Sequence, residues 1–362
     1  MNRVKRISFI SCATIILTSA LLATLLFVST SKSTTARADA TCIQYGAFLH
    51  NVSFIEAQQQ GFFAKQGLNV CYNQVTSSTQ QFNSLLSGQY DIVETTADNA
   101  VNRYVNSQLP VQIEAGIDQG AGLDLIVNTA NGIHSISDLK GKTVAVDAPN
   151  SGYVFALEKL LADNGLSLQN GDYSLQIIGG SLQRFQAISA GHTSTGDPVY
   201  ATILGTPFSE QAHYVSTLSD VAQFSSSMAP YQGATLVTTR NYAQTNPQTM
   251  TKFIAAMIQG YNFAVNPFHK NTVLADIAST DNVSTQIATD IYHDSMYDVV
   301  RGENGEELLN TFGLVNTINL RQQFGGFTAP VDSWQLVQPG TNSLYDDEYW
   351  KAALTLAFTP TK

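Results

Sequence analysis

Strand-like and helix-like segments alternate along residues 42–105. Short apolar runs, typical of buried strands, are each followed by a stretch in which apolar residues recur every three or four positions, the period of a helix. The strand-like runs cover residues 42–48, 68–75 and 90–94, and the helix-like stretches begin near Val52, before Phe82 and near Asp98. This order predicts a parallel sheet covered by helices on both faces.

The same alternation restarts after residue 142. Strand-like runs at 143–146, 175–178 and 199–204 are separated by helix-like stretches after Ser151 and around Leu182. We therefore predict a second lobe that is built like the first. Further strands are expected at 111–117 and 236–239, a helix from Pro247 with Asn246 as its cap, and helical pieces at 274–277 and 349–356.

Length and charge narrow the class of protein. A chain of 362 residues can form two cores, because single cores stop growing at roughly 250–300 residues. The formal net charge is -10, and residues 1–40 contain five basic residues and one acidic residue, so the rest of the chain carries -14. Such an acidic body would be repelled by phosphate backbones, which argues against nucleic acid as a partner.

The first forty residues have the pattern of a targeting segment. Arg3, Lys5 and Arg6 precede an apolar stretch at 7–28, and Ala38-Asp39-Ala40 offers small residues for a signal peptidase. We expect residues 1–40 to be a cleaved signal peptide, with an uncleaved membrane anchor as the alternative. In both cases the body is exported, to the periplasm or to the extracellular face of the membrane.

Motifs of catalysis and metal binding do not occur in the sequence. It contains no Gly-x-Ser-x-Gly elbow, no phosphate-binding loop and no His-Glu-x-x-His, and its six histidines have no metal-ligand spacing. We therefore expect a protein that is not an enzyme and that has neither a cofactor nor a metal.

Three segments resemble the type II periplasmic binding proteins of the nitrate/sulfonate/taurine group, which also includes binders of thiamine-pyrimidine precursors. They are AQQQGFFAKQGLNV at 57–70, LLSGQYDI at 85–92 and ISDLKGKTVAV at 136–146, and in each a glycine follows a predicted helix. The resemblance covers roughly residues 42–265. One departure is a polar insertion at 192–196, before the last predicted strand of the second lobe.

The resemblance implies an α/β fold of two lobes, each a mostly parallel sheet flanked by helices, with the ligand cleft between them. Lobe I would comprise residues 41–125 and 233–362, and lobe II residues 126–232. It also implies a monomeric substrate-binding component of an ABC importer, which captures a small organic solute by hinge closure and delivers it to a permease with its ATPase. The alternatives are a ligand-sensing domain for a receptor partner and an enzyme similar to the thiamine-pyrimidine synthases, whose cysteine-rich motif this chain lacks.

Cys42 and Cys71 lie in the first two predicted strands, which are neighbours in this fold. In an oxidising compartment they are expected to form a disulfide, and two buried free thiols are the alternative.

Candidate ligand contacts lie in loops that follow predicted strands, where the cleft of such a fold is found. The loop at 150–153 is the strongest candidate, because a helix begins in it and Tyr153 could pack over a ring of the ligand. Asp98 could instead be only a helix cap. The complete set is Phe48, His50, Asn51, Thr95, Thr96, Asp98, Asp118, Asn150, Ser151, Gly152, Tyr153, Thr206 and Phe208.

These loops contain aromatic and acidic side chains and no Arg or Lys. This composition favours a compact ring with N–H donors, such as an aminopyrimidine, over a sulfonate. Helix N-termini at Ser151 and Thr96 could still hold an anion through backbone N–H groups, so the sulfonate stays open.

Overall fold

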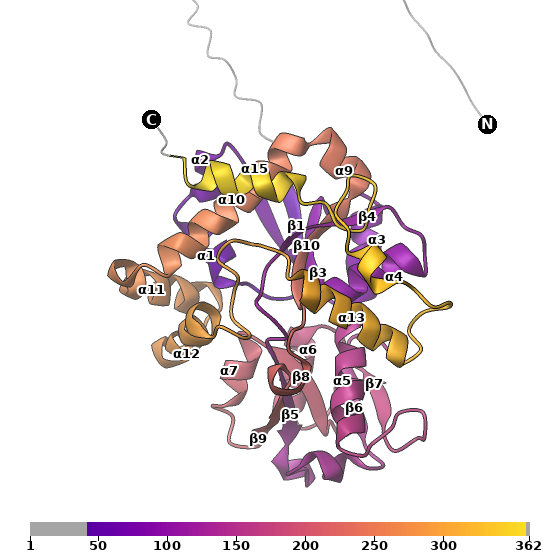
Figure 1. Cartoon of the computed structure of the whole chain (residues 1–362). Coiled ribbons are helices and arrows are strands. Elements are labelled where there is room, and N and C mark those ends of the chain that lie inside the picture. The colour runs from indigo at the N-terminus through magenta and orange to yellow at the C-terminus, as the bar shows by residue number, and fades with distance from the viewer. Residues whose placement is uncertain (1–41, 360–362) are drawn as a thin grey trace, which may run out of the picture. The chain divides into compact units, whose positions relative to one another are not determined.

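A computed structural model describes residues 42–359, and it contains two five-stranded sheets (Figure 1). The predicted targeting segment, residues 1–40, lies outside the described residues. Within residues 42–359, none of the helices combines the length and apolarity that a membrane span requires.

The first sheet joins strands from both ends of the described chain. Its order is β2 (Val70–Gln74), β1 (Ile43–Ala47), β3 (Ile92–Thr96), β10 (Ala234–Thr239) and β4 (Val111–Gly116). Strand β1 pairs in parallel with β2 and β3, whereas β10 is antiparallel to both β3 and β4.

The second sheet repeats this plan. Its order is β7 (Ser174–Ile177), β6 (Thr143–Val146), β8 (Ala201–Gly205), β5 (Leu123–Asn128) and β9 (Leu218–Gln223). Strand β6 pairs in parallel with its neighbours, and β5 is antiparallel to β8 and β9. In each sheet the antiparallel strand is the one that the chain forms directly after it leaves the other lobe. The two-lobed fold is therefore confirmed, with sheets that are mixed because the chain crosses over twice.

Helices cover both faces of the first sheet. One face packs against α1 (Val52–Gln59), α2 (Phe62–Lys65), α10 (Pro247–Ala264) and α15 (Glu348–Ala357). The other face packs against α3 (Ser78–Leu86), α4 (Ala97–Val105), α13 (Thr311–Gln323) and α14 (Ser333–Leu336). The remaining helices of this lobe are α9 (Arg240–Thr245), η3 (Pro267–His269), α11 (Lys270–Thr280) and α12 (Thr285–Tyr297), of which α11 and α12 pack against α1.

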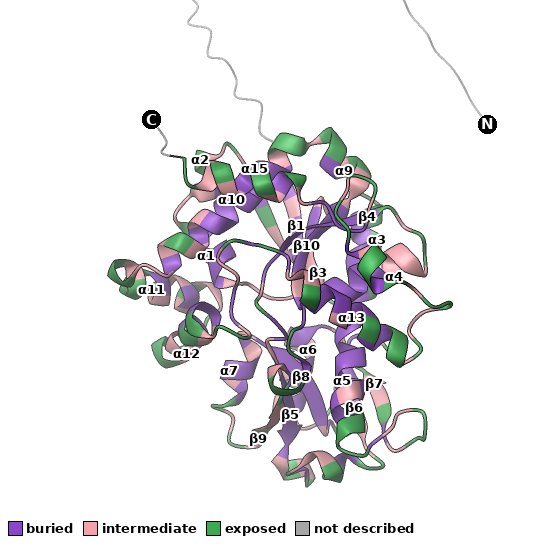
Figure 2. Ribbon diagram, in the orientation of Figure 1, coloured by how far each residue is buried: buried purple, intermediate pink, exposed green. Residues whose placement is uncertain are grey.

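The second sheet is covered in the same way. Helix α5 (Gly152–Asp163) packs on one face, and α6 (Ser181–Ala190) with α7 (Phe208–Ala212) on the other. Shorter turns complete this lobe: η1 (Thr129–Asn131), η2 (Ile136–Leu139) and α8 (Ser225–Met228). In Figure 2 the inner helix faces and the central strands are buried, whereas the edge strands β2, β7 and β9 are mostly intermediate or exposed. The middle of each sheet is therefore the centre of its own core.

The expected disulfide is present in the structure. Cys71 lies in β2, Cys42 directly precedes β1, and their Cα atoms are 5.8 Å apart. Because β1 and β2 are parallel neighbours, the bond fastens the edge of the first sheet.

Candidate ligand-binding cleft

A cavity of about 170 Å³ lies between the two sheets. Its walls come from the loop after β1, the end of β3, the segment after β8, the start of α7 and the residues that follow α12. The two connections between the lobes, after β4 and before β10, also line it. The volume is below the roughly 300 Å³ of a site for a drug-sized ligand, so the cleft suits a compact solute.

Part of the set of residues predicted from the sequence meets at this cleft. Seven line it: Phe48, His50, Asn51, Thr95, Thr96, Asp118 and Thr206. The other six lie outside its walls: Asp98, Asn150, Ser151, Gly152, Tyr153 and Phe208.

Asp98 and the loop at 150–153 contact other parts of the protein. Asp98 pairs with Arg321 of α13, which also donates to the side-chain and backbone oxygens of Asn150. The Gly152 N–H donates to Asn99 Oδ1 at 2.8 Å. A Cβ at Gly152 would collide with the Thr96 hydroxyl and come within 2.8 Å of Asp98 Cβ, so a glycine is needed where the lobes approach. This region is a packed contact between the lobes.

Tyr153 and Phe208 belong to the interior of the second lobe. The Tyr153 hydroxyl accepts from the Asp147 N–H at 2.9 Å, and the Arg184 guanidinium lies 4.8 Å from the Tyr153 ring. Phe208 stacks on Phe185 with ring centroids 5.3 Å apart. Both rings are therefore used in packing.

Asn51 has two roles at the floor of the cleft. Its Oδ1 caps α1 by accepting from the Phe54 N–H, and its Nδ2 donates to Glu94 Oε2 at 2.6 Å. The Tyr45 hydroxyl donates to the same Glu94 oxygen at 2.5 Å. Burial, with a further contribution from the charge of Glu303, raises the pKa of Glu94 to about 7.

The side chain of Glu303 lies at the N-terminus of α1. Its carboxylate accepts from the backbone N–H groups of Val52 and Ser53 and from the Ser53 hydroxyl. Burial raises the pKa of Glu303 to about 7, although these hydrogen bonds oppose the increase. The positive end of this helix is thus neutralised by a carboxylate of the chain itself.

Asp118 ties together the two connections between the lobes. It follows β4, and its carboxylate accepts from the N–H groups of Gly233 and Ala234, at 3.1 and 2.6 Å, and from Gln232 Nε2 at 3.2 Å. A Cβ at Gly233 would collide with this carboxylate. The requirement for glycine there follows from how closely the two connections approach.

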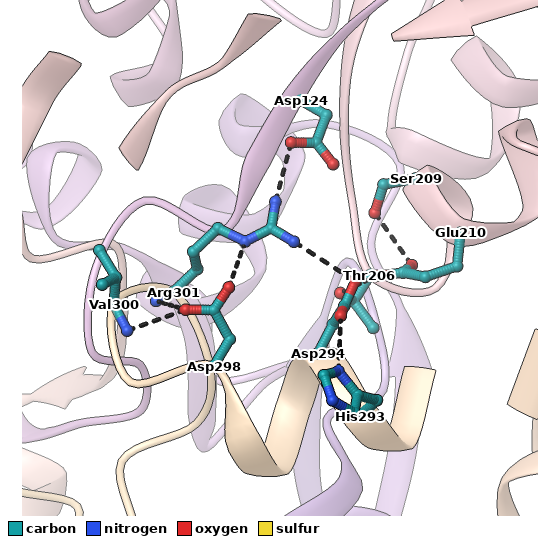
Figure 3. A network of polar contacts seen from close by, with 9 residues as sticks. All are labelled: Asp124, Thr206, Ser209, Glu210, His293, Asp294, Asp298, Val300 and Arg301. Carbon is teal, nitrogen blue, oxygen red and sulfur yellow. Dashed lines mark hydrogen bonds and ion pairs between the residues drawn. The ribbon is translucent and has the colours of Figure 1, made fainter. Parts of the chain in front are cut away.

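Arg301 brings a positive charge to the cleft, and three carboxylates surround it (Figure 3). Its Nη1 lies 3.0 Å from Asp124, its Nη2 3.3 Å from Asp294 and its Nε 2.8 Å from Asp298. Burial raises the pKa of Asp124 to about 7, and the guanidinium opposes that increase. Each nitrogen of the guanidinium therefore already faces an acidic partner.

One group of side chains has the composition of a metal site. Asp124, His213 and Asp220 each offer one ligand atom, and these atoms lie within 4.8 Å of one another. Asp124 is already paired with Arg301, and Asp220 Oδ1 accepts from the Ala222 N–H. These existing bonds compete with a metal, and we assign none.

Sequence reasoning missed most of the charged wall. A signal was available for Glu94, a carboxylate that directly follows the apolar pair Ile92-Val93 in a predicted strand. Arg301 and Glu303 lie in the C-terminal third, where the pattern did not order the elements, although Arg-Gly-Glu between two helices marks a polar turn. The other residues of the wall that were missed include Asp124, Glu210, Tyr231 and Asp294.

Comparison with known proteins identifies the family and the fold. Residues 50–268 match the family model described as NMT1/THI5 like, which spans more than half of the chain. A search of curated protein sequences found no significant match.

Three solved structures illustrate the likeness. The nitrate-binding protein NrtA from Synechocystis PCC 6803 has a TM-score of 0.68 at 13% identity, over 89% of this chain and 90% of that one. The alkanesulfonate-binding protein SsuA from Xanthomonas axonopodis pv. citri has 0.65 at 13%, over 83% and 96%. The Candida albicans CA3427 gene product, described as exhibiting the generic periplasmic binding protein fold, has 0.64 at 14%, over 83% and 95%. At such identities the likeness establishes the fold.

Proposed function

The chain belongs to the NMT1/THI5-like family, and on that premise we propose that it is the extracytoplasmic substrate-binding component of an ABC importer. It would capture a small organic solute in the cleft and release it unchanged to a membrane permease that works with an ATPase. The observation that carries this proposal is the cavity between the sheets, whose walls include both connections between the lobes. Similar folds in a nitrate-binding and an alkanesulfonate-binding protein support it.

Capture would proceed by closure of two lobes. We assign residues 41–125 and 233–362 to lobe I and residues 126–232 to lobe II, except that Leu123, Asp124 and Leu125 pair with β8 in the second sheet and therefore move with lobe II. The hinge would consist of the two connections, which Asp118 holds together through Gly233 and Ala234. A hinge made of a few residues at the ends of strands is the usual device for domain closure around a ligand.

Contacts across the cleft favour a closed arrangement in this structure. Arg301, on the lobe I side, pairs with Asp124 at the start of β5. The Tyr214 hydroxyl, just after α7, donates to Asp290 of α12 at 2.5 Å. These polar contacts would break when the lobes separate, and a ligand that holds both walls would favour their formation.

A compact ring with N–H donors is the ligand that we favour over a sulfonate. Phe48 and Tyr231 supply aromatic surface in the cleft, and Glu94 with Asp118 supplies acceptors. The first N–H group of each helix that could have held an oxyanion is engaged: the Gly152 N–H donates to Asn99, and the Ala97 N–H donates to the Gly233 carbonyl. An aminopyrimidine has the size and the donors that such walls would bind.

The protein would act outside the cytoplasm, as a monomer released by signal cleavage or held by its N-terminal segment. The disulfide between Cys42 and Cys71 supports an oxidising compartment. Neither catalysis nor a cofactor is part of the proposal.

A thermal-shift screen tests this function. Aminopyrimidines and alkyl sulfonates are titrated in parallel, because a ligand that binds only the folded protein raises its melting temperature by mass action. The compound that raises the melting temperature most is then incubated with the protein and recovered, and its mass is measured by mass spectrometry. We expect it to be recovered unchanged, and steady conversion into a product would overturn the binding role.

A further inference from the structure

We propose that the ligand of the cleft carries a positive charge, such as a protonated amine or amidine, and that Glu94 is its principal counter-charge. This inference rests on the proposed function, because it names the chemical class of solute that the cleft captures. Four observations support it: the charges of the cleft walls, the ion pairs that Arg301 already makes, the carboxylate that occupies the nearest helix N-terminus, and the Glu94 oxygen that has no partner among the described residues.

The charged side chains of the cleft are mostly acidic. Arg301 is the single Arg or Lys residue among those that line it within the described chain. Six carboxylates line the same space: Glu94, Asp118, Asp124, Glu210, Asp294 and Glu303. Above the pKa of about 7 that burial gives Glu94, Asp124 and Glu303, an anion that entered would meet a negative wall, and a cation would be attracted to it.

The guanidinium of Arg301 is already neutralised. Its three nitrogens face three separate carboxylates, those of Asp124, Asp294 and Asp298, at 2.8 to 3.3 Å (Figure 3). The guanidinium has five N–H donors, so an oxyanion could reach only those that these three contacts leave, and it would then lie beside the three carboxylates. The resulting repulsion between like charges offsets much of what such a contact would gain.

The nearest helix N-terminus is also closed to an anion. The first N–H groups of α1 point to the Glu303 carboxylate, which lines the cleft. A bound sulfonate would have to displace this carboxylate or lie beside it, and like charges in a site with little water repel each other strongly.

Glu94 keeps one oxygen available. Its Oε2 accepts from Tyr45 and Asn51, and among the described residues Oε1 has no hydrogen-bond partner. Because Glu94 lines the cleft, a ligand N–H can reach this carboxylate, and two fixed donors hold it in place.

A further buried acid, Glu307, lies behind this wall. Glu307 is 1% exposed, and neither of its carboxylate oxygens has a partner within residues 42–359. Burial, followed by the charges of Glu303, Glu94 and Asp118, raises the pKa of Glu307 well above its usual value. A cation in the cleft would stabilise the charged forms of these four acids and so lower their pKa values.

Aromatic surface completes the site for a cation. Phe48 and Tyr231 both line the cleft. Aromatic ring faces attract ammonium and amidinium groups, most strongly where water is excluded.

Three probes with one shared ring test the charge preference. Benzylammonium, benzyl alcohol and benzenesulfonate are titrated by calorimetry and NMR into the purified protein, above the pKa of about 7 that burial gives Glu94. Benzylammonium is expected to bind more tightly than the other two. Replacing Glu94 by Gln keeps the shape of the side chain and should weaken benzylammonium binding roughly 30-fold or more.

The matched control is Glu306→Gln, which removes an exposed carboxylate that does not line the cleft, and it should leave the affinity unchanged. Melting curves verify that Glu94→Gln remains folded. Tighter binding of benzenesulfonate, unchanged benzylammonium affinity in Glu94→Gln, or no benzylammonium binding at the highest soluble concentration would each overturn the charge assignment. Benzenesulfonate binding with compaction would overturn that assignment and leave the proposed function intact, whereas chemical conversion of a probe would overturn the function.

Discussion

Arg321 and Asp98 form a bidentate ion pair in which Nε and Nη2 each lie 2.7 Å from one carboxylate oxygen. Their side chains are 0% and 1% exposed. Arg321 lies in α13 and Asp98 in α4, and the same guanidinium reaches Asn150 at the edge of the second lobe. The pair therefore fastens two helices of one lobe to the loop that opens α5 in the other.

Replacing Arg321 by Met should strongly destabilise the protein. The change leaves the carboxylate of Asp98 buried without a partner, which costs about 3–5 kcal/mol of the free energy of unfolding. Urea denaturation measures the loss. The control is Lys159→Met, which removes a partly exposed pair with Asp163 within α5 and should cost about 0.5 kcal/mol or less. Equal effects of the two substitutions would contradict the role given to the buried pair.

The ligand-free protein should be more stable in mild acid than in mild base. Burial gives Glu94 and Glu303 pKa values of about 7, above the ordinary value of 4.5 that they regain on unfolding. Between these values the folded protein holds more protons than the unfolded chain, so the free energy of unfolding falls as the pH rises through this window. Melting temperatures at about pH 5 and about pH 8 measure the effect. Glu303→Gln should reduce the difference, and a higher melting temperature at the basic pH would refute the prediction.

The Cys42–Cys71 bond should contribute substantially to stability. The two cysteines are 29 residues apart in the sequence, and in the chain-entropy model a loop of that length gives about 3.5 kcal/mol. The double variant Cys42→Ala/Cys71→Ala should lose about that amount in urea denaturation. Peptide mapping without reduction provides the control, since recovery of the two cysteines as separately alkylated peptides would exclude the bond.

Asp124 should help to hold the lobes together. Asp124→Asn weakens its pairing with Arg301 across the cleft, so the open arrangement should become more populated without ligand. Small-angle scattering should then give a larger radius of gyration than for the ligand-free wild type. Asp347→Asn, which affects a partly exposed pair with Lys351 outside the cleft walls, is the matched control. Identical radii of gyration for Asp124→Asn and wild type would show that Asp124 does not help to hold the lobes closed.

Local signals in the sequence predict most of the framework. The strand at 143–146 and the helix from Pro247 occur as expected. Both were indicated by signals that lie within a short stretch of sequence, an apolar run for the strand and a proline at the first position for the helix. Strand β5 (Leu123–Asn128) was not predicted: Asp124 interrupts its apolar run, and its neighbours β8 and β9 come much later in the chain.

The candidate site was harder to predict for a related reason. Glu303 reaches Ser53 across 250 residues, and Arg321 reaches Asn150 across 171. No local pattern indicates that these carboxylate and guanidinium groups occupy the helix start and the loop where a ligand was expected. The sequence therefore predicts which loops face the cleft more readily than it predicts which of their groups remain free.

Small-angle scattering on the protein with and without a saturating cationic ligand tests the central claim most directly. The account predicts that the radius of gyration decreases on binding, toward the value calculated from this structure, and that Glu94→Gln at the same ligand concentration stays as extended as the ligand-free protein. An unchanged radius with the ligand demonstrably bound would contradict capture by closure of the lobes.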